Sequence, residues 1–283
     1  GLSDSASGCG GAGVPLGSAG GSDRVVAPGE RAATMWGGLM RARTALALLP
    51  ADLVRVGRDE LLVWMPAVPL VMALALRIGL RPGLEAAGLG RQAAETWTAR
   101  LDVLAFGALV PVLIGAVVGF LLLGEKEERV WDALAVTPVS LPGYLAWRAA
   151  GATLASGVAC GLCLVAGGLN DLGATGILAV ASAAAPLGGA TALALAAWTT
   201  GTIQGFAAVK LGFVLLILPG VLPAVAPQGP AVWATVLIPT WWPVQAYEAA
   251  TAGRPEAVWA VGAAAVGLVM MGAALATVGA RRR

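Results

Sequence analysis

Six long apolar segments constrain the fold more than any other feature of this sequence. They lie at about residues 61–80, 101–123, 144–168, 175–198, 206–226 and 256–279. A helix of roughly 20 residues crosses the hydrocarbon core of a bilayer, so each segment is long enough to span it. Only 12% of the 283 residues are charged, about half the share found in soluble domains. We therefore expect an all-α integral membrane protein with six transmembrane helices.

The sequence before the first apolar segment divides into two parts. Residues 1–34 are rich in Gly, Ser and Ala without a hydrophobic period, so we expect a disordered N-terminal extension. Between 39 and 56, apolar residues recur every three or four positions among arginines, which predicts an amphipathic helix on the membrane surface. A solvated linker is the alternative. We thus expect an interfacial segment at 35–60 and a six-helix membrane domain at 61–283.

Prolines interrupt the fifth apolar segment and the stretch that follows it. They are Pro219, Pro223, Pro227, Pro230, Pro239 and Pro243. A straight helix cannot contain so many, because each proline lacks a backbone N–H and clashes with the preceding turn. We expect residues 219–245 to form a broken helix and a re-entrant segment, which a membrane protein tolerates where the backbone is shielded by protein or reaches water.

Small residues within the segments predict packing rather than chemistry. Two glycine pairs, Gly115/Gly119 and Gly157/Gly161, have the GxxxG spacing that lets membrane helices approach closely. Cys160 and Cys163 have the spacing of a redox or metal pair, but they lie in an apolar run without further ligands. We interpret them as small, buried packing residues.

The distribution of lysine and arginine predicts the orientation. With the N-terminus inside, most of the 18 basic residues fall on the inner side. The exceptions, most of them in an expected outer loop at 81–100, are Arg77, Arg81, Arg91, Arg100 and Arg254. Because cytoplasmic loops carry an excess of basic residues, we expect both termini in the cytoplasm.

Several classes of activity lack the residues they need. The chain has no histidine, and the centres of the six segments have no Asp, Glu or Arg. Lys210 lies near enough to one end of its segment to reach the membrane surface. Proton- or sodium-driven carriers need ionisable groups within the membrane, and the sequence has no hydrolase or phosphate-loop motif. We expect no catalytic residues, metal or cofactor in this chain, and the net charge of +2 gives no reason to expect nucleic acid.

The densest polar cluster follows the second apolar segment, in a predicted loop at 124–143. It contains Glu125, Glu127, Glu128, Arg129 and Asp132, and an apolar run then ends at Thr137 and Pro138. The pattern predicts a short amphipathic helix that continues from the second segment and ends before Pro138. Such an element suits docking into a cytoplasmic partner, and an ordinary charged loop explains the pattern equally well.

The same cluster resembles the signature loop of ABC-2 type transporter permeases. The resemblance rests on Glu125-Lys-Glu-Glu-Arg129, on Ala133-Leu-Ala-Val-Thr-Pro-Val139 and on Tyr144-Leu-Ala-Trp-Arg148, with a further similarity at Leu237-Ile-Pro-Thr240. Within that family, the chain is similar to the permeases of mycobacterial fluoroquinolone-export ABC transporters and their relatives.

This resemblance implies the architecture of a type V exporter permease. It implies six helices, an N-terminal interfacial connecting helix and coupling to a separate ATP-binding subunit. The implied coupling residues are Glu125, Glu127, Glu128, Arg129, Asp132, Thr137 and Pro138. A re-entrant outer segment before the sixth helix is implied at Pro239, Thr240, Trp241 and Trp242.

The resemblance also implies the partners and the activity. The expected assembly contains two ABC ATP-binding subunits, which hold ATP and Mg, and a second permease subunit, identical or related, in the plasma membrane of a bacterium. We expect export of a hydrophobic or amphiphilic compound (a drug, antibiotic or lipid-like molecule), because apolar spans offer no counter-charge to a strongly charged cargo. The alternatives are an ion-coupled carrier or channel without an ATPase, and a membrane anchor that transports nothing.

Overall fold

The computed structural model describes residues 57, 60–88, 90–134, 136, 140–168, 172–225 and 235–280. The chain divides into units 1–48 and 49–283, and all the described residues belong to the second unit. The disordered segment expected at 1–34 and the interfacial helix expected at 39–56 lie outside the described residues. Over the described ranges the chain forms helices and turns and no strand, which confirms the all-α prediction.

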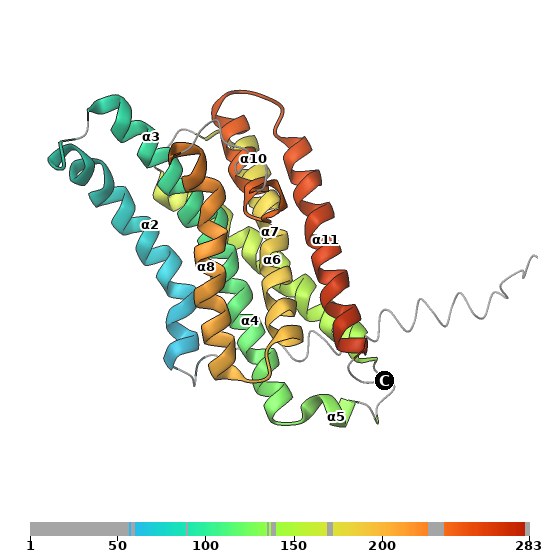
Figure 1. Cartoon of the computed structure of the whole chain (residues 1–283). Coiled ribbons are helices and arrows are strands. Elements are labelled where there is room, and N and C mark those ends of the chain that lie inside the picture. The colour runs from blue at the N-terminus through green and yellow to red at the C-terminus, as the bar shows by residue number, and fades with distance from the viewer. Residues whose placement is uncertain are drawn as a thin grey trace, which may run out of the picture. The chain divides into compact units, whose positions relative to one another are not determined.

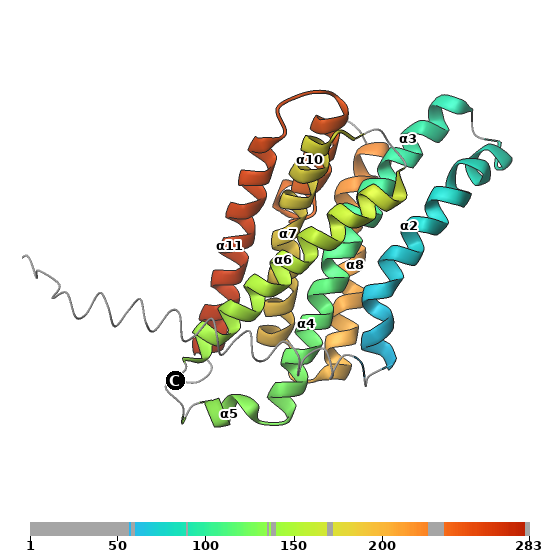
Figure 2. The same ribbon diagram turned by 180° about the vertical axis from the view of Figure 1, so that it is seen from behind.

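The described helices form a bundle of long, roughly aligned elements (Figures 1 and 2). In chain order they are α2 (Glu60–Ala86), α3 (Arg91–Asp102), the π-helix η1 (Val103–Leu109), α4 (Val110–Glu127), α5 (Val130–Leu134), α6 (Leu141–Gly167), α7 (Ala174–Trp198), α8 (Thr202–Val225), the 3-10 turn η2 (Thr235–Leu237), α10 (Trp241–Thr251) and α11 (Ala257–Ala280).

Five of the described helical segments are long and apolar enough to cross a membrane. They are Arg91–Glu127, Leu141–Gly167, Ala174–Trp198, Thr202–Pro219 and Ala257–Ala280, and they coincide with the second to sixth predicted spans. The first predicted span falls on α2, whose described apolar stretch, Ala67–Leu80, is shorter. The membrane crossing by the first predicted span therefore stays a prediction.

Helix α7 lies at the centre of the bundle, with α4, α6, α10 and α11 packed against it. Its buried residues are mostly Ala and Gly, which let neighbouring backbones approach closely. Both predicted glycine pairs face it: a Cβ at Gly115 would lie 2.9 Å from the Cα of Gly188, and one at Gly157 would lie 3.0 Å from the Cβ of Ala185. The predicted close contacts are thus present, and α7 is the partner helix for both glycine pairs.

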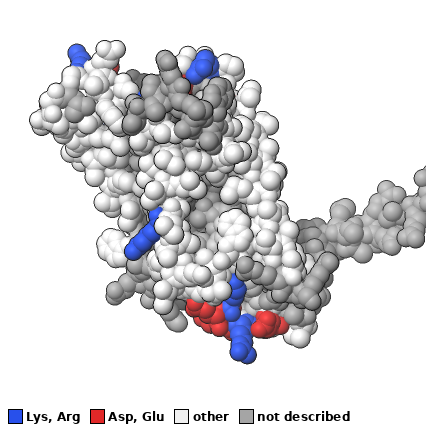
Figure 3. All heavy atoms as spheres, in the orientation of Figure 1, with Lys and Arg blue, Asp and Glu red and all other residues white. Residues whose placement is uncertain are grey.

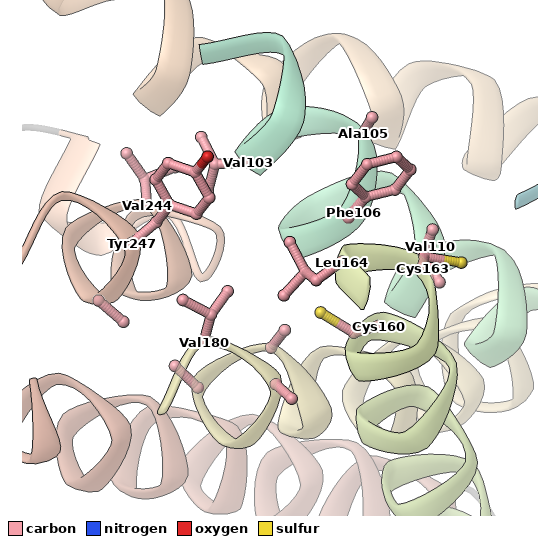
Figure 4. Packing of buried hydrophobic residues seen from close by; sticks show 14 of the residues in the cluster. Val103, Ala105, Phe106, Val110, Cys160, Cys163, Leu164, Val180, Val244 and Tyr247 are labelled. Carbon is pink, nitrogen blue, oxygen red and sulfur yellow. The ribbon is translucent and has the colours of Figure 1, made fainter. Parts of the chain in front are cut away.

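The cysteine pair lies in the main hydrophobic cluster, as the sequence predicted. Cys160 and Cys163 are free and buried on the face of α6 that meets Phe106 and Val110 (Figure 4). Leu164 belongs to the same cluster. The two thiols therefore contribute packing between α6 and the second span.

The outer loop expected at 81–100 is mostly helical. α2 continues to Ala86 and α3 begins at Arg91, and Gly88 between them has a φ of +79° that favours glycine. The two helices form a hairpin at the end of the bundle opposite α5 (Figure 1). On α2, the guanidinium of Arg77 donates a hydrogen bond to the carbonyl oxygen of Ala166 (3.0 Å) and so satisfies one of the last carbonyls of α6.

The prediction that the helix breaks from Pro219 onward is wrong for residues 219–225, because α8 continues through Pro219 and Pro223 to Val225. Membrane helices tolerate proline where side chains bind the backbone groups it releases. Pro219 leaves the carbonyl of Leu215 without its helical donor, and the hydroxyl of Thr240 donates a hydrogen bond to the neighbouring carbonyl oxygen of Leu216 (2.7 Å) in the same turn.

Helix α10 is too short to cross a bilayer. Its 11 residues extend about 16 Å at 1.5 Å per residue, roughly half the hydrocarbon thickness. It lies at the end of the bundle that carries the α2–α3 hairpin, and α11 then runs toward the other end (Figures 1 and 2).

Candidate coupling site

The predicted coupling loop lies at the end of the bundle opposite α10, where α5 projects beyond α4 (Figure 1). The expectation that one helix continues from the second span into the loop is wrong. α4 ends at Glu127, Glu128 leaves helical geometry, and Arg129 adopts a left-handed φ of +58° before α5 begins. That conformation is uncommon for a residue with a side chain, and it turns the chain. The short helix is therefore a separate element.

Glu125 is buried and joins α4 to the start of α6. Its carboxylate forms an ion pair with Arg148 and accepts a hydrogen bond from the hydroxyl of Tyr144, at 2.9 and 3.0 Å to its two oxygens. The Nε of Arg148 also donates to the hydroxyl of Tyr144 (2.9 Å). Only 5% of the Glu125 side chain and 10% of the Arg148 side chain are exposed. Glu125 therefore faces its own subunit.

Lys126 binds the end of α7. Its ammonium donates to the carbonyl oxygens of Thr199 (2.7 Å) and Ala196 (3.2 Å) and lies 5.6 Å from the ring centre of Trp131. The last carbonyls of a helix lack partners within the helix and carry the negative end of its dipole, so a cation stabilises them.

Glu127 binds the start of α8. One carboxylate oxygen accepts hydrogen bonds from the backbone N–H of Thr202 (2.8 Å) and from its hydroxyl (3.1 Å). The first N–H groups of a helix lack internal acceptors and favour an anion. Glu127 therefore caps α8 from a helix 75 residues earlier.

The remaining predicted residues divide into an exposed set and an undescribed set. Glu128, Arg129 and Asp132 are exposed, whereas Trp131 on α5 is buried. Figure 3 shows acidic and basic side chains gathered at this end, below a broad band that is mostly uncharged. Thr137 and Pro138 lie outside the described residues. Glu127 is exposed as well, although its carboxylate binds Thr202, whereas Glu125 is buried and lies out of reach of a partner.

Sequence reasoning did not assign roles to Tyr144, Arg148 and Thr202. A signal was present for one pair, because Glu125 and Arg148 are opposite charges at the adjacent ends of consecutive apolar segments. No sequence pattern indicated that Glu127 reaches Thr202.

The predicted outer segment is built from buried and aromatic residues. Thr240 is buried and bound to α8, and Pro239 precedes it. Trp241 packs edge-to-face on Trp242, with ring centres 5.2 Å apart, and on Trp259 of α11, with ring centres 5.4 Å apart. These contacts fasten α10 to the last helix.

A buried carboxylate near this segment was not among the predicted site residues. Asp102 ends α3 within the candidate span Arg91–Glu127, and only 2% of it is exposed. The hydroxyl of Tyr247 on α10 donates a hydrogen bond to it. The π-helical turn η1 follows directly; such turns are frequent at functional sites.

An apolar groove of about 1100 Å³ runs between α6, α7 and α11. Its lining includes Leu154, Val158, Leu178, Leu268 and Met271. Thr153 and Ser182 supply hydroxyl groups, and no charged side chain lines it among the described residues. The groove can therefore offer apolar contact but no counter-charge.

Comparison with known proteins assigns the family. The family model described as "Fluoroquinolones export permease protein Rv2686c-like" matches residues 52–277. No curated protein and no solved structure matches the chain. The matched region contains all six predicted spans almost completely, the charged cluster around the end of α4 and the segment around α10. The chain therefore belongs to the Rv2686c-like family of fluoroquinolones export permease proteins.

Proposed function

We propose that this chain is the membrane subunit of an ABC-2 type exporter that is driven by a separate ATP-binding subunit. The observation that carries the proposal is the end of the second span. There α5 projects from the bundle and Glu128, Arg129 and Asp132 are exposed. Membership of an export permease family supplies the direction of transport.

In this proposal two permease subunits enclose the transport path, and two ATP-binding subunits dock beneath them. ATP, bound to those subunits together with Mg, would supply the energy for transport. Closure of the ATPase pair presses on α5 and on the segment with Thr137 and Pro138. Each permease then rotates as a rigid body toward a state open to the outside. The permease needs no titrating group for this step.

The proposed topology has six crossings with both termini in the cytoplasm. α2 makes the first crossing, and α5 lies on the cytoplasmic side. η2 and α10 form the re-entrant outer segment, because α10 spans only about half of the bilayer. Support comes from the basic residues of the sequence, most of which fall on the α5 side in this orientation.

The proposed cargo is a hydrophobic or amphiphilic compound taken from the cytoplasm or the inner leaflet. The groove is lined mostly by apolar side chains of α6, α7 and α11, which are all candidate membrane spans. A strongly charged cargo would require buried counter-charges. The family name, which refers to fluoroquinolones, agrees with an amphiphilic drug-like molecule.

The test is ATP-dependent export by the permease co-expressed with a candidate ATP-binding subunit. The double variant Glu128→Lys/Arg129→Glu should reduce export and ATPase stimulation while membrane insertion is retained. The matched control is Arg91→Glu/Glu95→Lys, which reverses an exposed ion pair on α3 at the opposite end of the bundle (3.8 Å). Unchanged export in the first variant would overturn the coupling assignment.

An ion-coupled carrier is the alternative function that Asp102 favours, because a buried carboxylate in a candidate span is typical of such carriers. In that case the purified chain alone would transport in response to an ion gradient. Transport without nucleotide that is abolished in Asp102→Asn would favour this carrier over the ATP-driven exporter.

A further inference from the structure

We infer that Glu125, Lys126 and Glu127 are positioning residues that fasten the end of α4 to three other helices, so that these helix ends move together. The inference rests on the proposed function, because it concerns how a push on α5 reaches the bundle. It changes the role implied for Glu125 and Glu127, from contacts with the ATP-binding subunit to contacts within the permease.

Consecutive residues of an α-helix project about 100° apart, so three in a row point in widely different directions. Each of these three side chains finds a partner on a different helix: Arg148 on α6, the carbonyls at the end of α7, and Thr202 on α8. Packing of one helix face against one neighbour cannot produce this pattern.

The charges of Lys126 and Glu127 match the helix ends that they bind. The cation lies on the C-terminal carbonyls of α7, and the anion lies on the N-terminal N–H of α8. Hydrogen bonds with one charged partner are shorter and stronger than neutral ones. Exchanging Lys126 and Glu127 would place each charge against the wrong helix end.

Lys126 and Glu127 bind the two sides of one short turn. α7 ends at Trp198 and α8 begins at Thr202. Within this turn, a Cβ at Gly201 would lie 2.9 Å from the Glu127 carboxylate. Glycine therefore leaves the space that the carboxylate occupies.

In this inference, a force on α5 reaches the other helices through the end of α4. α5 follows α4 after the turn at Glu128 and Arg129, so movement of α5 pulls on the last turn of α4. Through the three contacts, the last turn of α4 then displaces the ends of α6, α7 and α8 together. Glu128 lies one residue beyond the last residue of α4, in the turn that leads to α5, and it is exposed, as Glu127 is.

The experiment compares Lys126→Met and Glu127→Gln with Glu128→Gln in the permease co-reconstituted with its ATP-binding subunit. Three quantities are measured: retention of the ATP-binding subunit, ATP hydrolysis, and export per ATP hydrolysed. We expect Lys126→Met and Glu127→Gln to retain the partner but to lower export per ATP at least threefold. Glu128→Gln should instead weaken retention of the partner. Glu95→Gln on α3, at the opposite end of the bundle, is the neutral control.

Two further measurements keep the inference testable where a variant folds poorly. Lys126→Arg retains a cation and should keep export per ATP within twofold of the wild type. Amide hydrogen exchange in the full-length permease alone should rise at Thr199–Thr202 in Lys126→Met and not in Glu95→Gln.

The outcomes separate the two proposals. If the wild-type pair shows no ATP-dependent export, the proposed function fails, whereas raised exchange at the α7–α8 turn would still support the fastening. If the wild type exports and Lys126→Met and Glu127→Gln keep the wild-type export per ATP, the positioning role is overturned. Loss of partner retention in these two variants would also overturn it, because it would make them docking residues.

Discussion

Tyr247 donates a hydrogen bond to the carboxylate of Asp102 across 145 residues of sequence. Both side chains are buried, with 2% of each residue exposed. Tyr247 belongs to the short helix α10, and Asp102 stands at the junction of α3 with the π-helical turn η1. One contact thus fastens the proposed re-entrant segment to the second span.

Tyr247→Phe should lower the free energy of unfolding. It removes a buried hydrogen bond to a carboxylate, and such bonds contribute about 1.5–3 kcal/mol. The midpoint of thermal unfolding in detergent measures the effect. Glu248→Gln, at an exposed position of the same helix, should leave the midpoint unchanged. A wild-type midpoint in Tyr247→Phe would show that the contact adds no stability.

Gly188→Ala should loosen the packing of α6 on α7. A Cβ at Gly188 would lie 2.7 Å from the Cβ of Ser156 and 2.9 Å from the carbonyl oxygen of Ala152. Overpacking of this kind costs about 1–3 kcal/mol, which thermal unfolding would detect. The control is Gly151→Ala on α6, where a Cβ meets nothing within 4 Å; it should be neutral or stabilise by up to about 1 kcal/mol. Equal midpoints for the two variants would contradict the close approach.

Gly262→Ala should displace the indole of Trp242. A Cβ at Gly262 would lie 2.7 Å from Cη2 of that ring, so the ring must move or α11 must shift. We expect a changed near-ultraviolet circular dichroism spectrum, because Trp242 packs edge-to-face on Trp241. Gly272→Ala lies on the same helix in open space and should keep the wild-type spectrum. A spectrum unaltered by Gly262→Ala would argue against the contact.

Cysteine labelling should place the two ends of the bundle on opposite sides of the membrane. In a Cys9→Ser background, the remaining native thiols, Cys160 and Cys163, are buried. A membrane-impermeant maleimide should label Arg254→Cys in intact cells but should label Glu128→Cys only after the cells are opened. The reverse pattern would invert the proposed topology and remove α5 from the reach of a cytoplasmic ATPase.

The sequence alone predicted the features that depend on short stretches of chain. An apolar run of about 20 residues specifies a membrane helix whatever its neighbours are, and five predicted spans coincide with helices of the structure. GxxxG spacing is equally local, so the contacts of Gly115 and Gly157 could be expected, although their common partner α7 could not. The motif after the second span identified the family.

Only the tertiary structure decided which contacts each of several similar residues makes. Glu125, Glu127 and Glu128 differ little in sequence, yet the first is buried against Arg148, the second caps α8 and the third lies just beyond the end of α4. Asp102 and Tyr247 meet because α10 packs beside η1, and Thr240 binds the turn of α8 before Pro219 because the two segments are neighbours in the fold. Such pairings depend on which helices become neighbours and on the angle at which each side chain leaves its helix, and apolar composition specifies neither.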